Sequence, residues 1–234
     1  MKKKTRWPIY LIIGLIVTFI AFTVPLPYYI EVPGTSEDIR RVLQVNNQPD
    51  QEEGSYQFVT VGVKHARLVD LVYAWLTPFT DIRSVKEMTG GSSDTEYMRI
   101  NQFYMETSQN MAKYQGLKTA GKEIELKYLG VYVLTVTDNS TFKGILNIAD
   151  TVTAVNDKTF ESSKEMVDYV NSQTLGDKVK VTYQEDGKVK TAEGKIITLE
   201  NGKNGIGIGL IDRTEVSSDV PIKFSTAGIG GPSA

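Results

Sequence analysis

The first thirty residues constrain what the chain can form more than any other stretch. Residues 7–30 contain no charged side chain, and four basic residues precede them: Lys2, Lys3, Lys4 and Arg6. A helix needs about twenty apolar residues to cross a hydrocarbon core about 30 Å thick. We therefore predict that residues 1–30 form a cytoplasmic basic tip and a transmembrane helix that contacts membrane lipid through residues 7–30. The basic tip stays cytoplasmic by the positive-inside bias.

A cleaved signal peptide has the same basic start, but its apolar core usually spans only about 7–15 residues. In this chain the strongly apolar part runs from Ile9 to Val24 and leads into a proline-containing stretch that ends at Tyr29. We favour an uncleaved single-pass anchor in the cell membrane. The bulk of the protein is then extracellular.

The composition of the whole chain excludes several classes of function. Hydrophobic residues make up 41% and charged residues 23%, which is ordinary for a globular protein. A net charge of −2 without a basic cluster argues against nucleic acid as a partner. The absence of cysteine excludes disulfides, thiolate metal sites and cysteine nucleophiles. No phosphate-binding Gly-x-x-x-x-Gly-Lys motif is present, so we expect no ATP, no metal and no other cofactor.

Residues 31–122 predict a small extracellular α/β segment, so the chain as a whole belongs to the mixed α/β (α+β) class. We expect a turn at residues 31–35 and a strand over 56–63. A helix with an apolar stripe follows from Leu68 to Leu76, and a second helix runs from Ser93 to Gln115. His65 is the only histidine, and we interpret it as a surface residue without a catalytic role.

Residues 123–198 carry the clearest domain pattern. A glycine turn at Leu129-Gly130-Val131 runs into a strand, and a second strand covers residues 151–155. A helix begins after Ser162, whose capping partner is Glu165, and a hairpin over residues 178–192 turns at Glu185-Asp186-Gly187. This order resembles that of PDZ domains, which are β-sandwiches with helices. Ala149 stands where such domains usually have glycine.

The resemblance to PDZ domains implies a peptide-binding site. In such a site a peptide adds to the exposed edge of the second strand, and backbone N–H groups of the glycine loop hold its terminal carboxylate. The residues implied here are Leu129, Gly130, Val131, Tyr132, Val133, Leu134, Met166 and Val170. A PDZ fold that serves only as a spacer or as a dock for its neighbour remains an alternative.

Residues 226–234 read Thr-Ala-Gly-Ile-Gly-Gly-Pro-Ser-Ala, in which small neighbours leave Ser233 accessible. This segment resembles the nucleophile segment of Lon-type serine proteases. The whole chain is similar to the membrane-anchored, PDZ-containing, ATPase-free Lon-like proteases of Gram-positive bacteria. The resemblance implies that Ser233 is the catalytic nucleophile and that residues 199–234 begin a Lon-like catalytic domain.

The Lon-like family uses a lysine base some tens of residues after the serine, whereas this sequence ends one residue after Ser233. We therefore expect the 234 residues to be inactive alone. We also expect the last thirty or so residues to be poorly ordered, because strands without partners cannot bury an apolar face or pair their edges. The first hypothesis is a membrane-tethered serine endopeptidase of the Ser-Lys type whose PDZ domain binds peptide or protein substrates. The alternative is a membrane-anchored PDZ module without catalysis. A carboxyl-terminal processing protease ranks third, because its serine has a different context.

Overall fold

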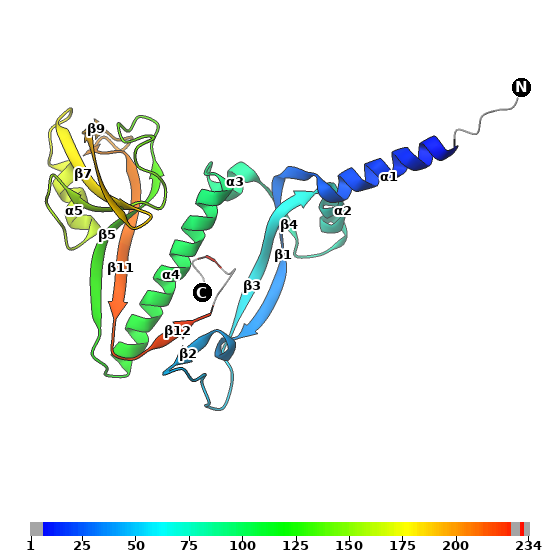
Figure 1. Ribbon diagram of the computed structural model, residues 1–234, viewed down its shortest axis with the longest axis horizontal. Helices are drawn as coiled ribbons and strands as arrows, with labels where there is room; N and C mark the ends of the chain where they lie inside the picture. The colour runs from blue at the N-terminus through cyan, green and yellow to red at the C-terminus, as the bar shows by residue number, and fades with distance from the viewer. Residues whose placement is uncertain (1–6, 226–229, 232–234) are drawn as a thin grey trace, which may run out of the picture. The chain divides into compact units, whose positions relative to one another are not determined.

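The computed structural model describes residues 7–225 and 230–231 (Figure 1). The chain divides into two compact units, and its mixed α/β class is confirmed. Met1–Arg41 and Glu52–Asp94 form unit 1, while Val42–Gln51 and Thr95–Ala234 form unit 2. The long helix α4 (Asp94–Thr119) therefore belongs to unit 2 from its second residue. The expected segment over residues 31–122 is thus shared between the two units.

The first helix, α1, covers Trp7–Thr23 and is shorter than the predicted anchor. Its residues are uncharged, and Pro25 starts the next strand, so the helix stops before Tyr28 and Tyr29. Within residues 7–225 no helix has both the length and the apolar character required to cross a membrane. The helix thus covers only residues 7–23 of the predicted anchor over residues 7–30, and its place in a membrane stays a prediction.

Unit 1 is built on an antiparallel sheet with strand order β3-β1-β4. Its strands are β1 (Pro25–Asp38), β3 (Gln57–Arg67) and β4 (Asp81–Ser84). The turn predicted at residues 31–35 is wrong, because β1 continues through it with a register shift between Pro33 and Ser36. Pro33 lacks an N–H group, and β1 tolerates it because β4 pairs only with residues 28–31.

Short helices follow the strands of unit 1. The helix predicted after β3 is confirmed as α2 (Leu68–Leu76), and α3 (Val85–Thr89) follows β4. A single 3-10 turn, Ile39–Arg41, ends the first part of the unit. Ser84 caps α3 by accepting a hydrogen bond from the backbone N–H of Glu87 at 3.2 Å.

The one histidine of the sequence joins a polar cluster in unit 1. His65 Nε2 and Asp94 Oδ2 share a hydrogen bond of 2.7 Å, and the Tyr29 hydroxyl donates to Asp94 Oδ1 at 2.7 Å. The Tyr29 and His65 rings stack with centroids 4.3 Å apart. Hydrogen bonds from Tyr29 and His65 lower the pKa of Asp94. This cluster holds the first residue of α4 against β1 and β3.

We expect Asp94→Asn to lower the melting temperature near neutral pH. A carboxyl whose pKa is lower in the folded state stabilises the fold above its unfolded pKa, and the effect is lost as the pH falls through the folded pKa. The difference between the two proteins should therefore be present at neutral pH and vanish well below the ordinary aspartate value of 3.8. Thermal unfolding followed by circular dichroism over this pH range tests it. A difference that persists in acid would show that the ionised carboxylate is not responsible.

Unit 2 is built on a five-stranded antiparallel sheet with the order β11-β5-β6-β7-β8. Its strands are β5 (Glu125–Val136), β6 (Thr151–Val155), β7 (Lys178–Glu185), β8 (Lys188–Lys195) and β11 (Ile208–Ser217). The helix α5 (Ser163–Asn171) lies between β6 and β7 in the chain. The predicted hairpin is confirmed, since β7 and β8 pair from Lys178–Lys195 to Glu185–Lys188.

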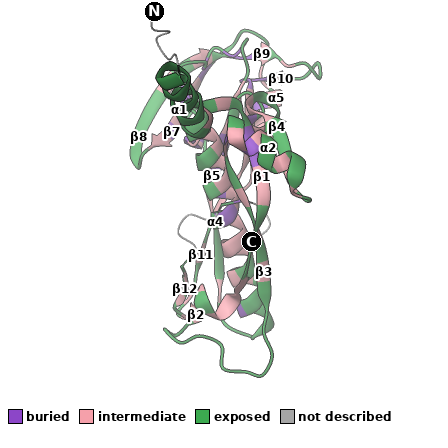
Figure 2. Cartoon of the chain, turned by 90° about the vertical axis from the view of Figure 1, so that its right-hand side faces the viewer, coloured by how far each residue is buried: buried purple, intermediate pink, exposed green. Residues whose placement is uncertain are grey.

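One hydrophobic core holds unit 2 together. Alternate residues of the central strands point into it, among them Val131, Val133, Val179 and Val181, each at most 1% exposed. Phe142 is fully buried and packs in the same cluster with residues of α5. Figure 2 shows buried residues in purple; in the sheet of unit 1 these are Tyr29, Ile30 and Ala66.

The C-terminal part of the described chain is ordered, which corrects the expectation of a poorly ordered tail. Residues 204–205 form β10, which pairs with β9 (Ile197–Thr198), and β11 pairs with β5. The strand β12 (Ile222–Phe224) pairs with β2 (Leu43–Val45). The missing partners that the prediction assumed are thus supplied by earlier parts of the same chain.

Candidate functional site

The helix α5 forms one wall of the candidate site, and its start is determined locally. The Ser162 hydroxyl accepts a hydrogen bond from the backbone N–H of Glu165 at 3.2 Å, as predicted. The Glu165 carboxylate in turn accepts from the backbone N–H of Glu161 at 3.0 Å. Met166 and Val170 are buried one turn apart and fix the inner face of the helix.

The strand β5 forms the other wall, and Gly130 permits its path. Gly130 has a φ of 131°, and a Cβ atom placed on it would lie 2.2 Å from the backbone oxygen of Val152 on β6. Only glycine allows both this φ and this close approach of two strands. The glycine of the predicted loop is therefore required for the pairing of β5 with β6.

We expect Gly130→Ala to destabilise unit 2 by about 2–6 kcal/mol, because backbone strain and overpacking each cost about 1–3 kcal/mol. Gly176→Ala is a matched control, since Gly176 also has a positive φ of 86° but nothing lies within 4 Å of its Cβ position. The control should cost only about 1–2 kcal/mol. Urea unfolding of both variants measures the difference. Equal losses would show that the contact with Val152 is unimportant.

The outer edge of β5 is paired along its length with β11. Leu210 lies opposite Val133, and Ile211 lies opposite Tyr132. The register shifts twice, between Gly209 and Leu210 and between Arg213 and Thr214. The free edge expected for an incoming peptide is therefore not free in this structure, because a later segment of the chain lies antiparallel on it.

One side of β11 faces α5. Ile208 and Leu210 pack against the hydrophobic core that includes Met166 and Val170. Two residues further along, Asp212 Oδ1 accepts a hydrogen bond of 3.0 Å from the backbone N–H of Ser163. That N–H is one of the free donors at the start of α5, where the helix dipole favours a negative charge.

Tyr128 lies near Asp212 and near Glu165 of α5. Burial together with the negative charges of Asp212 and Glu165 raises the pKa of its hydroxyl to about 12. The hydroxyl is buried and has no hydrogen-bond partner among the described residues. A buried hydroxyl without a partner costs free energy, so it is a candidate contact for a ligand.

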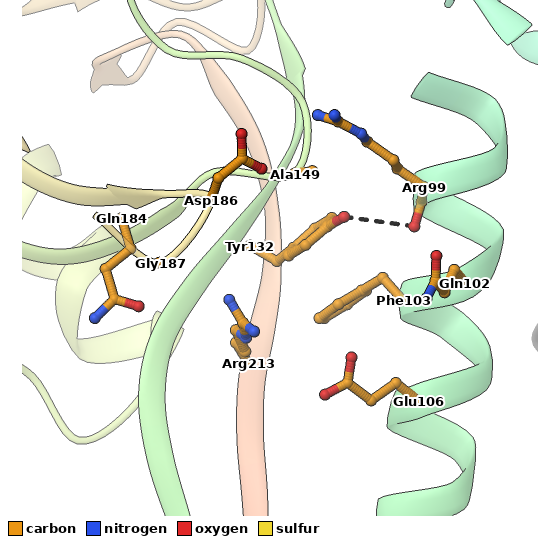
Figure 3. Close-up of a pocket in the computed structure, with 10 residues that line it drawn as sticks. All are labelled: Arg99, Gln102, Phe103, Glu106, Tyr132, Ala149, Gln184, Asp186, Gly187 and Arg213. Carbon is orange, nitrogen blue, oxygen red and sulfur yellow. Dashed lines mark hydrogen bonds between the residues drawn. The ribbon is translucent and has the colours of Figure 1, made fainter. Parts of the chain in front are cut away.

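The other side of β11 lines a pocket of about 250 Å³ between α4 and the sheet. Tyr132 stacks on Phe103 of α4 with ring centroids 3.8 Å apart, and its hydroxyl donates to the backbone oxygen of Arg99 at 3.4 Å (Figure 3). Arg213 donates to the Thr151 hydroxyl at 2.6 Å. Burial raises the pKa of Tyr132, which keeps the phenol neutral as a donor. The other lining residues are Gln102, Glu106, Ala149, Gln184, Asp186 and Gly187.

The structure places the predicted peptide-binding residues together but not all in the expected role. Gly130, Val131, Tyr132 and Val133 are buried in β5, while Leu129 and Leu134 are half-buried at the breaks in register. Met166 and Val170 are 2% and 5% exposed in the core. Their binding to a peptide stays a prediction, as does the catalytic role of Ser233, which lies outside the described residues.

Sequence reasoning missed Asp212, Ser163 and the whole of β11 as parts of the site. The signal was present in the alternation of Ile208, Leu210 and Asp212, which places an apolar pair and a carboxylate on one side of a strand. Because residues 199–234 are predicted to begin a separate domain, the sequence does not predict them as a partner for β5.

Comparison with known proteins identifies residues 102–196 as a match to the PDZ domain family model. Among solved structures, the PDZ domain of an SdrC-like protein from Listeria monocytogenes is 35% identical, with a TM-score of 0.35, and the match covers 37% of this chain and 93% of that one. The PDZ domain of an SdrC-like protein from Listeria innocua is 38% identical, with a TM-score of 0.34 and coverages of 35% and 92%. No curated protein matches the chain.

Proposed function

We propose that this chain, which contains a PDZ domain over residues 102–196, recognises extended peptide segments in the groove between β5 and α5. PDZ domains bind peptides by adding a strand to the edge of their sheet beside a helix. The observation that carries the proposal is β11, an extended segment that already lies antiparallel on this edge. It occupies the position that an added peptide strand would take.

The contacts of β11 define the ligand that the groove favours. An apolar residue at each of two alternate positions would replace Ile208 and Leu210 against the core. A carboxylate two residues further along would replace that of Asp212 at the N–H group of Ser163. In a peptide ligand this carboxylate is an aspartate or a glutamate side chain or the terminal carboxylate. The Tyr128 hydroxyl offers a further donor to the same segment.

An external peptide competes with β11, which is part of the same chain and is therefore present at a high effective concentration. Binding from solution should be weak while β11 is in place. A variant that weakens β11 without altering β5 or α5 should bind a peptide more tightly. This dependence distinguishes a binding groove from an edge that is permanently part of the fold.

We expect the double variant Ile208→Asp, Leu210→Asp to bind a fluorescent peptide with the native sequence of residues 206–217, whereas the unmodified chain binds it at least about tenfold more weakly. Burying a single large apolar side chain is worth about a factor of ten in binding, and the variant strand loses two. Fluorescence anisotropy measures both affinities. Failure of the folded double variant to bind the peptide would contradict the proposal.

The variant Ser163→Pro provides a matched control in the same background. It removes the backbone N–H group of residue 163, which donates a hydrogen bond to Asp212. Residue 163 is the first residue of α5, a position where proline is well tolerated. The preceding residue, Ser162, has extended φ and ψ angles that suit a following proline. Ser163→Pro should weaken the binding of the native peptide by about tenfold, since hydrogen bonds to charged groups contribute about 1.5–3 kcal/mol. It should leave unchanged the affinity of a peptide in which the counterpart of Asp212 is alanine.

We further propose that the peptide groove serves a membrane-tethered serine endopeptidase in which Ser233 is the nucleophile. The support is the resemblance of residues 226–234 to the Lon-type nucleophile segment and the charge-free sequence of residues 7–30. In this proposal the chain is held at the cell membrane with its N-terminus cytoplasmic, and the PDZ domain delivers extracellular peptides or proteins to a Ser-Lys site. The alternative is an anchored PDZ module that binds partners without cutting them.

The endopeptidase is tested by Ser233→Ala in the gene of the cell that makes the protein. Extracellular peptides are then compared by mass spectrometry with those of cells that carry Ser225→Ala, a nearby serine outside the Gly-Gly-Pro-Ser motif. We expect peptide products to disappear only with Ser233→Ala, because removing the hydroxyl removes the nucleophile. Identical peptide profiles would favour the module without catalysis and leave the groove proposal intact.

A further inference from the structure

The helix α2 exposes its apolar side to the surroundings. Its sequence places Leu68, Val72, Trp75 and Leu76 along one stripe of the helix, and Phe79 follows in the next turn of chain. We call these five residues the α2 face. Trp75 is 84%, Leu76 68% and Phe79 90% exposed. Most of the predicted apolar stripe of the helix therefore faces outward, whereas Leu71, which belongs to the same stripe, is half-buried.

The inner side of α2 carries one polar residue. Asp70 is 6% exposed, and its carboxylate accepts from Lys64 Nζ at 2.8 Å and from the backbone N–H of Arg67, the residue before the helix, at 2.8 Å. Its neighbours on that side of the helix, Leu71 and Ala74, are half-buried. A surface helix in water normally keeps its large apolar side chains on the core. The exposure of the α2 face indicates that its outer surroundings are less polar than water.

The neighbouring helix α1 indicates what those surroundings are. It contacts α2 and β3, and its 17 residues include no charged side chain. Figure 2 shows α1 as exposed along its length. A partner protein would cover one side of such a helix, whereas lipid surrounds a helix that is apolar on every side. The α2 face continues this apolar surface within unit 1, beside the C-terminal end of α1 (Figure 1).

We propose that the α2 face lies in the interface of a lipid bilayer beside α1. Trp75 sits at the level of the headgroups, where the amphipathic indole ring is favoured, and Leu76 and Phe79 reach the start of the acyl chains. The lipid contact fixes unit 1 at the bilayer surface at a second point in addition to α1. This assignment rests on the membrane tether proposed above, but it is independent of the peptide groove and of Ser233.

The experiment uses the full chain with Trp7→Phe, so that Trp75 is its only tryptophan. The protein is reconstituted in phosphatidylcholine vesicles whose lipids are brominated either near the headgroup or near the end of the acyl chain. We expect the Trp75 emission to shift to the blue and to be quenched more by the shallow bromine. Absence of quenching in vesicle-bound protein overturns the proposal.

Two variants complete the test in the same Trp7→Phe background. Leu76→Asp with Phe79→Asp should remove the quenching of Trp75 while the protein stays on the vesicles through α1. A chain with Trp75→Phe and Tyr56→Trp carries the probe at an equally exposed site, 76% exposed, outside the α2 face, and should not be quenched. Quenching of both probes alike would show non-specific contact. A blue shift without quenching, together with a doubled mass in sedimentation, would assign the α2 face to a second copy of the chain; either result overturns the proposal.

Discussion

The pairing of β11 with β5 is the contact that arranges the candidate site of unit 2. It satisfies the backbone groups along one edge of the sheet from residue 125 to residue 136, which would otherwise be open. It also brings Ile208 and Leu210 onto the core and Asp212 to the start of α5. The groove, its occupant and the pocket beside α4 all follow from this one antiparallel ladder.

In the peptide recognition proposed above, the same pairing involves the segment that follows β11. Beyond β11 the chain forms β12 on β2, and the backbone N–H of Gly231 donates to the Asn101 oxygen of α4 at 2.9 Å. A ligand that replaces β11 on β5 would therefore release one end of the segment that leads to Ser233. Two alternative occupants of one strand position form a two-state element, and a ligand shifts such an element only by its differential affinity.

Much of the PDZ domain could be predicted because its signals are local. The capping pair Ser162 and Glu165 marks the start of α5, and Asp186-Gly187, both with positive φ, mark the β7–β8 turn. The turn predicted at residues 31–35 failed because local proline and glycine signals were overridden by pairing with β3. The disorder predicted for the tail failed because it assumed that β11 and β12 had no partners.

The sequence by itself determined where α2, α5 and the β7–β8 hairpin lie, and which residues form the apolar stripe of α2. These features depend on side chains within a few residues of one another. Only the tertiary structure decided that β11 pairs with β5, about eighty residues earlier, and that the stripe of α2 faces outward. An apolar stripe or a strand edge indicates that some other surface must cover it or pair with it. Which surface does so depends on contacts distant in sequence and on the surrounding medium.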